Sequence, residues 1–254
     1  MKFLLRQWIV IITFASINTE TEAQTDTSNA SIYTAALENT IQFYIDKLNG
    51  YQGLYNGSEY IGSYPGTTGS PFFEGETLQK GYISFDGVLY QNIGLKYDLV
   101  SNQVIIKAKQ NLLMALVREK IDYFSLNGHL FIHLIPDTAR NDFPEPGFYE
   151  VLYEVLYEGP VRVLARRNKN VERGVKPEDP NIFRQYNHYY IEKNSRFYPI
   201  SSQGELIAVF ADRKEEMKNY LRRSKAKFKK DPQKNIVEAA EYYGSLKNNY
   251  DRSR

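Results

Sequence analysis

Two tight-turn dipeptides inside a region of alternating hydrophobicity constrain the fold of this chain more than any other feature. From residue 81 to about residue 200, apolar and polar side chains alternate with the period of two that is typical of β-strands. Asp86-Gly87 and Asn127-Gly128 each separate two short apolar runs, and both dipeptides tolerate the positive φ angles of a two-residue hairpin turn. Ser101-Asn102 gives a third, weaker turn signal. Short strands joined by such turns predict an antiparallel β-meander, as an open or a rolled sheet. Further strands are expected at residues 148–158, 161–167, 182–191 and 197–200.

The segment of residues 149–157 fits two interpretations, because its four-residue repeat could also be one face of a helix. As a strand, it places tyrosine and valine on one side and glutamate and leucine on the other. Its β-branched and tyrosine content, with Gly147 before it and Gly159-Pro160 after it, favours the strand.

Helical patterns flank the loop and sheet region of residues 51–200. Apolar side chains recur at three- and four-residue steps in residues 31–48 and predict an N-terminal helix within residues 24–50. Ser202-x-x-Glu205 is a capping-box pattern followed by helical spacing as far as Leu221, and Asp231-Pro232 can start a second helix. The sequence thus predicts an α+β fold, with an N-terminal helix and two C-terminal helices packed on the sheet. These two basic helices occupy residues 201–254, and residues 24–254 are expected to form one domain.

The N-terminus carries the pattern of a cleaved secretory signal peptide in residues 1–23. Lys2 and Arg6 form a basic segment that precedes an apolar run at residues 8–15. A polar stretch follows and ends at Ala23 before Gln24, with small residues at the positions that a signal peptidase recognises. The run is shorter than the ~20 residues that cross a membrane as a helix. No second apolar run of that length follows. We therefore expect export to the periplasm, the cell surface or the extracellular medium, and no transmembrane segment in the mature chain.

Composition excludes several kinds of site. The chain has no cysteine, which rules out disulfides, thiolate metal centres and a cysteine nucleophile. Acidic side chains outnumber basic ones before residue 160, and the reverse holds after it. A basic run can meet nucleic acid, anionic lipid or an acidic glycan, but it can equally be a solvated helix face. Because the chain carries an export signal, we do not expect nucleic acid as a partner.

Few patterns in the sequence indicate catalysis. His129 and His133 are four residues apart, which on a strand separates them by ~13 Å, too far for one zinc ion, so we expect no metal and no cofactor. Asp86 and Asp98 could form a carboxylate pair for glycoside hydrolysis, although Asp86 fits a turn position better. No nucleophile elbow, HExxH motif, phosphate-binding loop or dinucleotide fingerprint occurs. The sequence therefore favours a non-enzymatic protein without catalytic residues.

Aromatic side chains concentrate in a Gly-rich segment between the predicted N-terminal helix and the sheet. Its Gly and Pro content excludes a helix and long strands. Aromatic rings with a polar tip suit exposed binding surfaces, and loops on a rigid scaffold frequently carry binding residues. The alternative is that these rings pin an irregular loop onto the sheet. The candidate binding residues are Tyr51, Tyr55, Tyr60, Tyr64, Phe72 and Phe73.

Four phrases of the sequence together resemble a known family. They are LYNGSEY (residues 54–60), PFF (71–73), GYISFDGVLYQNIGLKYDL (81–99) and GFYEVLY (147–153), followed by Lys/Arg-rich C-terminal helices. The set resembles a family of exported, functionally uncharacterised proteins of Bacteroidetes-type Gram-negative bacteria. The resemblance implies export and a β-rich body, and it supplies no catalytic residues. Where that family often has a histidine before Pro-Phe-Phe, this chain has Ser70.

These observations lead to a functional hypothesis. We expect an exported, non-enzymatic binding or assembly module whose partner is an envelope protein or a glycan. The alternatives are a glycan-binding or glycan-hydrolysing protein and a lipid-carrying half-barrel, which would need a continuous apolar groove. The concave face of the sheet distinguishes these hypotheses. It can be filled by side chains, open and apolar, or lined by carboxylates and aromatic rings.

Overall fold

The computed structural model describes residues 53–136, 144–176, 178–224 and 228–251. All of these residues belong to one compact unit, Ile41–Arg254. The predicted signal peptide, the predicted N-terminal helix and Tyr51 lie outside the described residues.

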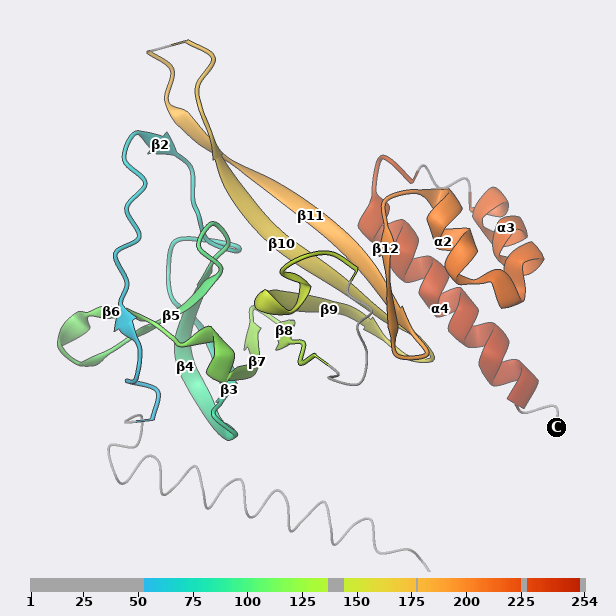
Figure 1. Ribbon diagram of the computed structural model, residues 1–254, viewed down its shortest axis with the longest axis horizontal. Helices are drawn as coiled ribbons and strands as arrows, with labels where there is room; N and C mark the ends of the chain where they lie inside the picture. The colour runs from blue at the N-terminus through green and yellow to red at the C-terminus, as the bar shows by residue number, and fades with distance from the viewer. Residues whose placement is uncertain (1–52, 137–143, 177, 225–227, 252–254) are drawn as a thin grey trace, which may run out of the picture. The chain divides into compact units, whose positions relative to one another are not determined.

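The described residues form one sheet of twelve strands, antiparallel in all but one of its pairs. The strands are β1 (Ser58–Glu59), β2 (Thr67–Thr68), β3 (Gln79–Phe85), β4 (Val88–Asp98), β5 (Gln103–Lys107), β6 (Leu113–Ala115), β7 (Ile121–Leu126), β8 (His129–His133), β9 (Leu152–Glu158), β10 (Arg162–Glu172), β11 (Asn181–Lys193) and β12 (Arg196–Ile200). Their order across the sheet is β1-β6-β5-β4-β3-β7-β8-β9-β10-β11-β12, and β2 pairs with β11 in parallel (Figure 1). The predicted β-rich, largely antiparallel body is therefore confirmed, and β9 confirms the strand interpretation of residues 149–157 from Leu152 onward.

Both predicted hairpin turns are present. Asp86-Gly87 joins β3 to β4 with φ angles of 55° and 74°, and Asn127-Gly128 joins β7 to β8 with φ angles of 51° and 81°. Positive φ at both central residues is the property of a type I′ turn, whose twist matches that of the two strands it connects. The third predicted turn is a longer connection between β4 and β5, and its last residue, Asn102, has a φ of 54°.

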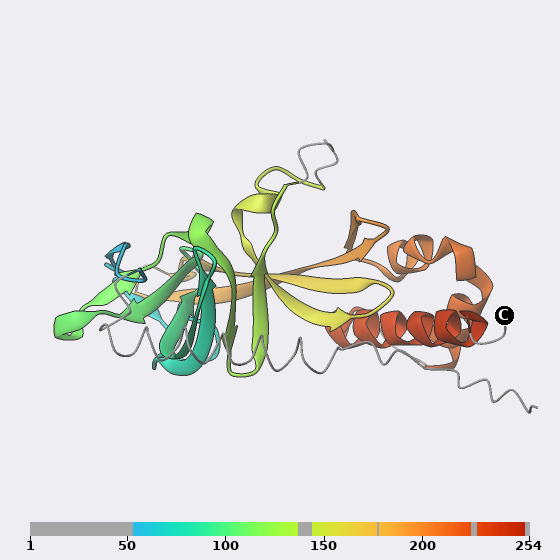
Figure 2. The same cartoon turned by 90° about the horizontal axis from the view of Figure 1, so that it is seen from below.

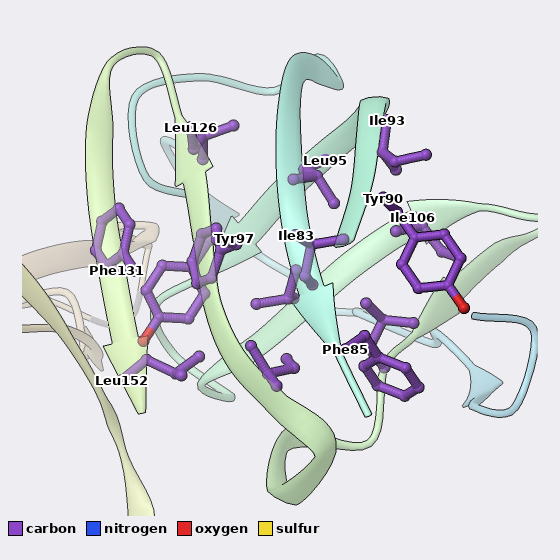
Figure 3. Close-up of a cluster of buried hydrophobic side chains, with 14 of the residues drawn as sticks. Ile83, Phe85, Tyr90, Ile93, Leu95, Tyr97, Ile106, Leu126, Phe131 and Leu152 are labelled. Carbon is purple, nitrogen blue, oxygen red and sulfur yellow. The ribbon is translucent and has the colours of Figure 1, made fainter. Parts of the chain in front are cut away.

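The sheet curls around its main hydrophobic core. Side chains from β3, β4, β5, β7, β8 and β9 meet in one buried cluster (Figure 3). Within it, the ring of Tyr97 on β4 contacts the rings of Phe124 and Phe131 at centroid distances of 5.5 and 5.3 Å. Because two other strands separate β4 from β8 in the sheet order, a ring contact between them requires the sheet to curve. Side chains fill the inside of the curve.

The long β10–β11 ribbon contacts the end of β4 and the loop before β3. The amide of Lys169 on β10 donates a 3.0 Å hydrogen bond to the carbonyl of Leu99, directly after β4. At the start of β11, Asn181 lies opposite Thr67 of β2. The distal half of the ribbon therefore lies against the β4–β5 turn and against the loop that precedes β3.

Three α-helices follow the sheet, where the sequence predicted two. They are α2 (Gln203–Val209), α3 (Lys214–Arg223) and α4 (Pro232–Asp251). Ser202 and Glu205 form the predicted capping box at the start of α2. The predicted continuous helix from there to Leu221 is wrong, because a 3-10 turn, Ala211–Arg213, separates α2 from α3. Phe210 precedes this turn and stacks on Tyr243 of α4 at 4.5 Å, so the chain changes direction at a buried ring.

The helices build a second core on one face of the ribbon. α4 lies against β9 and β10 (Figure 2). On β10, Val163 and Ala165 face this second core, whereas Leu164 faces a third, smaller cluster that includes Phe148 and Tyr190. The second core and the third cluster therefore lie on opposite faces of β10. Within the described residues, no helix is both long enough and apolar enough to cross a membrane.

Candidate functional site

Three of the predicted binding residues meet on the outer face of β4. Lys96 and Asp98 alternate along β4 with two side chains of the main core, so they point away from that core. The loop before β3 covers this outer face with aromatic rings. We refer to the following residues as the β4 cluster: Lys96, Asp98, Tyr60, Tyr64 and Phe72.

The other predicted binding residues lie elsewhere. Phe73 is buried in the main core, where its ring contacts that of Phe131 at 5.1 Å. Tyr55 is half-buried and packs against the same core. Tyr51 lies outside the described residues. Of the five predicted binding residues that the structure describes, it thus brings three together.

Asp98 is the centre of the β4 cluster. Its side chain is completely buried, with 0% exposure. Oδ2 accepts hydrogen bonds from the hydroxyls of Tyr60 at 2.6 Å and Tyr64 at 2.8 Å. Oδ1 accepts from the backbone amides of Val100 at 2.7 Å and Ser101 at 3.1 Å. The second pair of bonds is an Asx-turn, a common role of Asp at the end of a strand, and it shapes the β4–β5 connection. Four donors satisfy both oxygens of a buried carboxylate.

Two lysines accompany this carboxylate. Nζ of Lys96 lies 3.9 Å from the centre of the Phe72 ring and 5.9 Å from that of Tyr60, a cation–π arrangement. Nζ of Lys169 donates to the carbonyls of Ser70 at 2.9 Å and Phe72 at 2.7 Å. Burial lowers the pKa of both lysines, and the charge of Asp98 acts in the opposite direction. The aromatic loop is thus held by Lys96 from β4 and by Lys169 from β10.

The tyrosine hydroxyls are held in their protonated form. Burial is the largest cause that raises the pKa of Tyr60, and the hydrogen bond to Asp98 is the next. The same two causes raise the pKa of Tyr64 to about 12. The tyrosine hydroxyls therefore stay neutral donors to Asp98 across the physiological range, so the β4 cluster is a stable anchor for the loop.

The two carboxylates considered for glycoside hydrolysis are not brought together. Asp86 lies in the β3–β4 turn and pairs with Lys120 at 2.9 Å. Asp98 lies at the opposite end of β4, an 11-residue strand that is about 30 Å long. A hydrolytic pair needs its carboxyl groups about 5–9.5 Å apart. The geometry therefore gives this pair no joint role.

The histidines of β8 have different partners. His129 lies between two carboxylates, with Nδ1 2.6 Å from Glu154 and Nε2 3.3 Å from Glu74. Glu154 is buried and also accepts from Arg167 at 2.6 Å. His133 instead donates from Nε2 to the carbonyl of Tyr149 at 3.0 Å. Among the described residues, no group of three or more His, Asp or Glu side chains is placed to hold a metal ion.

A cavity of about 420 Å³ lies on the face of the sheet that carries the third cluster. It lies among β7, β8, the 3-10 turn Phe148–Glu150 and the adjoining ends of β10, β11 and β12. Its wall combines apolar side chains with two carboxylates, a histidine and an arginine. The lining residues are Asp122, Ile132, His133, Leu134, Ile135, Tyr149, Arg162, Glu192, Ser195 and Phe197.

No sequence pattern points to Lys96, Lys169 or the cavity. The alternation along β4 indicated that Lys96 and Asp98 share a face, but it could not indicate what covers that face. Lys169 belongs to a basic run that fits a solvated surface equally well. The cavity draws its wall from six separate parts of the chain, and no local pattern marks such a convergence.

Comparison of the chain with protein-family models, with curated proteins and with solved structures gives no match. The resemblance to an exported Bacteroidetes-type family therefore stays a prediction.

Proposed function

We propose that this chain is an exported binding or assembly module that holds a protein partner through the loop between β1 and β2. The tripartite N-terminus supports export. The observation that carries the binding role is a pair of exposed apolar residues, one on this firmly anchored loop and one directly before β6. Ile61 is 81% exposed and Leu112 is 50% exposed.

Extrapolated beyond its last pair, the register of β1 and β6 brings these two residues next to each other. Ser58 lies opposite Ala115, and Glu59 lies opposite Met114. The amide of the next residue, Tyr60, donates to the carbonyl of Leu113 at 2.9 Å. Continued by one residue, the same antiparallel register sets Ile61 against Leu112. Neighbouring exposed apolar side chains at a sheet edge are typical of protein–protein contacts.

The β4 cluster explains how such a surface can be preformed. Asp98 and Lys96 hold the chain on both sides of Ile61, through Tyr60 directly before it and through Tyr64 and Phe72 further along the loop. A partner would then meet an ordered loop and would lose less affinity to the entropy of ordering it. This role also agrees with the saturated carboxylate of Asp98, which has no lone pair left for a substrate proton.

The filled interior of the curved sheet does not favour the lipid-carrying alternative. Every buried member of the main core is 8% exposed or less, so the described side chains occupy the space that a lipid chain would need. Glycan hydrolysis has no support from the Asp86–Asp98 pair. Glycan binding without hydrolysis would use a different part of the molecule, the cavity on the face of the sheet that carries the third cluster.

Site-specific crosslinking tests the binding role. A photoreactive amino acid at position 61, in cells that export the protein, should capture one envelope protein reproducibly, and Leu112→Glu should abolish that capture without lowering the melting temperature. The same photoreactive group at Val175, which is 98% exposed in the β10–β11 connection, is the matched control. Equal capture from both positions, or capture that survives Leu112→Glu, would contradict the proposal.

The export part has its own test. Mass spectrometry of the native protein should find a mature N-terminus near Gln24. An intact Met1 in a cytosolic fraction would exclude export, whatever the crosslinking result.

A further inference from the structure

The cavity on the third-cluster face has the composition of a ligand site, and the proposed function does not use it. Its volume of about 420 Å³ falls within the range of about 300–1,000 Å³ that is typical of small-molecule sites. Ile132 and Leu134 supply apolar wall from β8 and its continuation, and both belong to the third cluster. The cavity is therefore bordered by side chains of the packed third cluster.

Two aromatic rings in the wall are fixed in place. Tyr149 and Phe197 both contact the ring of Phe148, at centroid distances of 5.1 and 5.0 Å, and they face each other edge-on at 6.5 Å. Phe148 is itself fully buried. A flat ring presents an apolar surface on which another small ring can lie, so preset rings of this kind favour a cyclic ligand.

The guanidinium of the wall is paired with a carboxylate. Arg162 donates to Oε2 of Glu192 from Nε at 2.8 Å and from a terminal nitrogen at 2.5 Å. Because this guanidinium is already paired, it offers no free positive charge to an anionic ligand. An anionic ligand would therefore enter without a counter-ion, which costs free energy in a partly dehydrated site.

The polar atoms that remain include both acceptors and donors. His133 donates from Nε2 to a backbone carbonyl, so in its neutral form Nδ1 is an acceptor. Asp122 accepts from Ser84 through Oδ2 at 2.7 Å, and a carboxylate has further acceptor capacity on its other oxygen. The Arg162 fork has five N–H donors, more than its bonds to Glu192 use. Hydroxyl groups, which both donate and accept, match such a mixed wall best.

We propose that this cavity binds a neutral saccharide unit, with one sugar ring against Tyr149 and Phe197 and its hydroxyls on Asp122, His133 and the Arg162–Glu192 pair. The ring supplies the apolar face, the hydroxyls supply donors and acceptors, and the absence of a net ligand charge matches the paired arginine. This site is separate from the Ile61–Leu112 surface, so either proposal can fail without the other.

Methyl NMR of the full mature chain tests the proposal. Glucose, galactose, mannose and N-acetylglucosamine, each at millimolar concentration, are the probes, and lysine and glutamate form the charged arm. At least one sugar should shift the methyl signals of Ile132, Leu134 and Ile135 in a saturable way, and the charged arm should not. A set of sugars that shifts none of these methyls, or amino acids that shift them equally, would overturn the proposal.

Two variants with a matched control locate the site. Arg162→Gln should weaken sugar binding at least about fivefold, because it removes charge-assisted donors from the wall. Arg184→Gln breaks a comparable Arg–Glu pair, with Glu172, on the distal part of the same ribbon and should leave sugar binding unchanged. If Arg162→Gln lowers the melting temperature, Asp122→Asn, at an exposed position, serves instead. Undiminished binding in a folded Arg162→Gln or Asp122→Asn variant would place the sugar elsewhere and contradict the assignment.

Discussion

The hydroxyl of Tyr60 donates a 2.6 Å hydrogen bond to Oδ2 of Asp98, a side chain 38 positions further along the chain. Tyr64 donates to the same oxygen at 2.8 Å. One buried carboxylate thereby fixes the aromatic loop at two points. Whether the rings of this loop mainly recognise a partner or mainly hold the loop is decided by how the protein responds when they are removed.

The first prediction concerns the anchor itself. Asp98→Asn keeps the shape of the side chain but turns one acceptor into a donor, so that two of the four bonds to this group are lost. We expect a loss of about 2–4 kcal/mol in the free energy of unfolding, measured by urea denaturation. Asp86→Asn is the control, since Asp86 is an exposed turn residue whose ion pair with Lys120 contributes at most about 1 kcal/mol. Equal effects of the two substitutions would show that Asp98 is not the anchor.

The second prediction concerns the loop rings. Tyr55→Ala combined with Tyr60→Ala should melt early, with a total loss of about 3–5 kcal/mol, because both half-buried rings pack on the sheet. Thermal unfolding followed by circular dichroism measures this. Ile61→Ala, at an exposed position, should change stability by less than about 0.5 kcal/mol. A double variant that melts normally but no longer binds its partner would show instead that the rings themselves form the recognition surface.

The third prediction isolates backbone strain at the β7–β8 turn. Gly128 has a φ of 81°, and an added Cβ would have no atom within 4 Å. Gly128→Val should therefore destabilise by roughly 1–3 kcal/mol through conformation alone. Gly204→Ala, within α2 and close to no atom but the Ser202 hydroxyl, should be neutral or slightly stabilising. An unchanged urea midpoint for Gly128→Val would contradict the observed turn geometry.

The fourth prediction is a loss of stability at alkaline pH. The pKa of Tyr64 is raised from 10.0 to about 12, so between these values the folded state keeps a proton that the unfolded state releases. The unfolded state then binds fewer protons, and the free energy of unfolding falls as the pH rises through this window. Tyr64→Phe should make the fall less steep, and the absorbance of tyrosinate should show one fewer late-titrating group. A slope identical to that of the original protein would contradict the raised pKa.

Short-range chemistry explains which parts of the fold could be predicted. The turns at Asp86-Gly87 and Asn127-Gly128 and the Ser202–Glu205 capping box depend on a few adjacent residues, and all three are present as predicted. The break between α2 and α3 could not be predicted, because the apolar spacing continues through it. At the break, Phe210 stacks on a ring of α4, a contact with a residue far along the chain that local spacing does not contain.

The candidate site shows the same division. The aromatic residues were found from composition alone, but composition could not separate Phe73, which enters the core, from Phe72, which covers Lys96. Alternation along β4 separates Asp98 from Tyr97 by face, but it does not predict that Asp98 is buried, because the tyrosines that cover it lie far from it in the sequence. Side-chain burial at a polar strand position depends on long-range contacts that a pattern of alternation does not contain.

The pairing of β2 with β11 has a consequence for the order of folding. The hairpins at Gly87 and Gly128 can close as soon as their strands are made, because their contacts are local. Tyr60 and Tyr64 can meet Asp98 early. The same loop also needs β11 for its strand pair and Lys169 of β10 for its carbonyls, so its last contacts form only when most of the chain has been synthesised. A segment near the start of the chain thus completes its contacts late in folding. Until then, a tyrosine- and phenylalanine-rich segment stays open to chaperones and proteases, and a chain that stops before Asn181 would keep it open permanently.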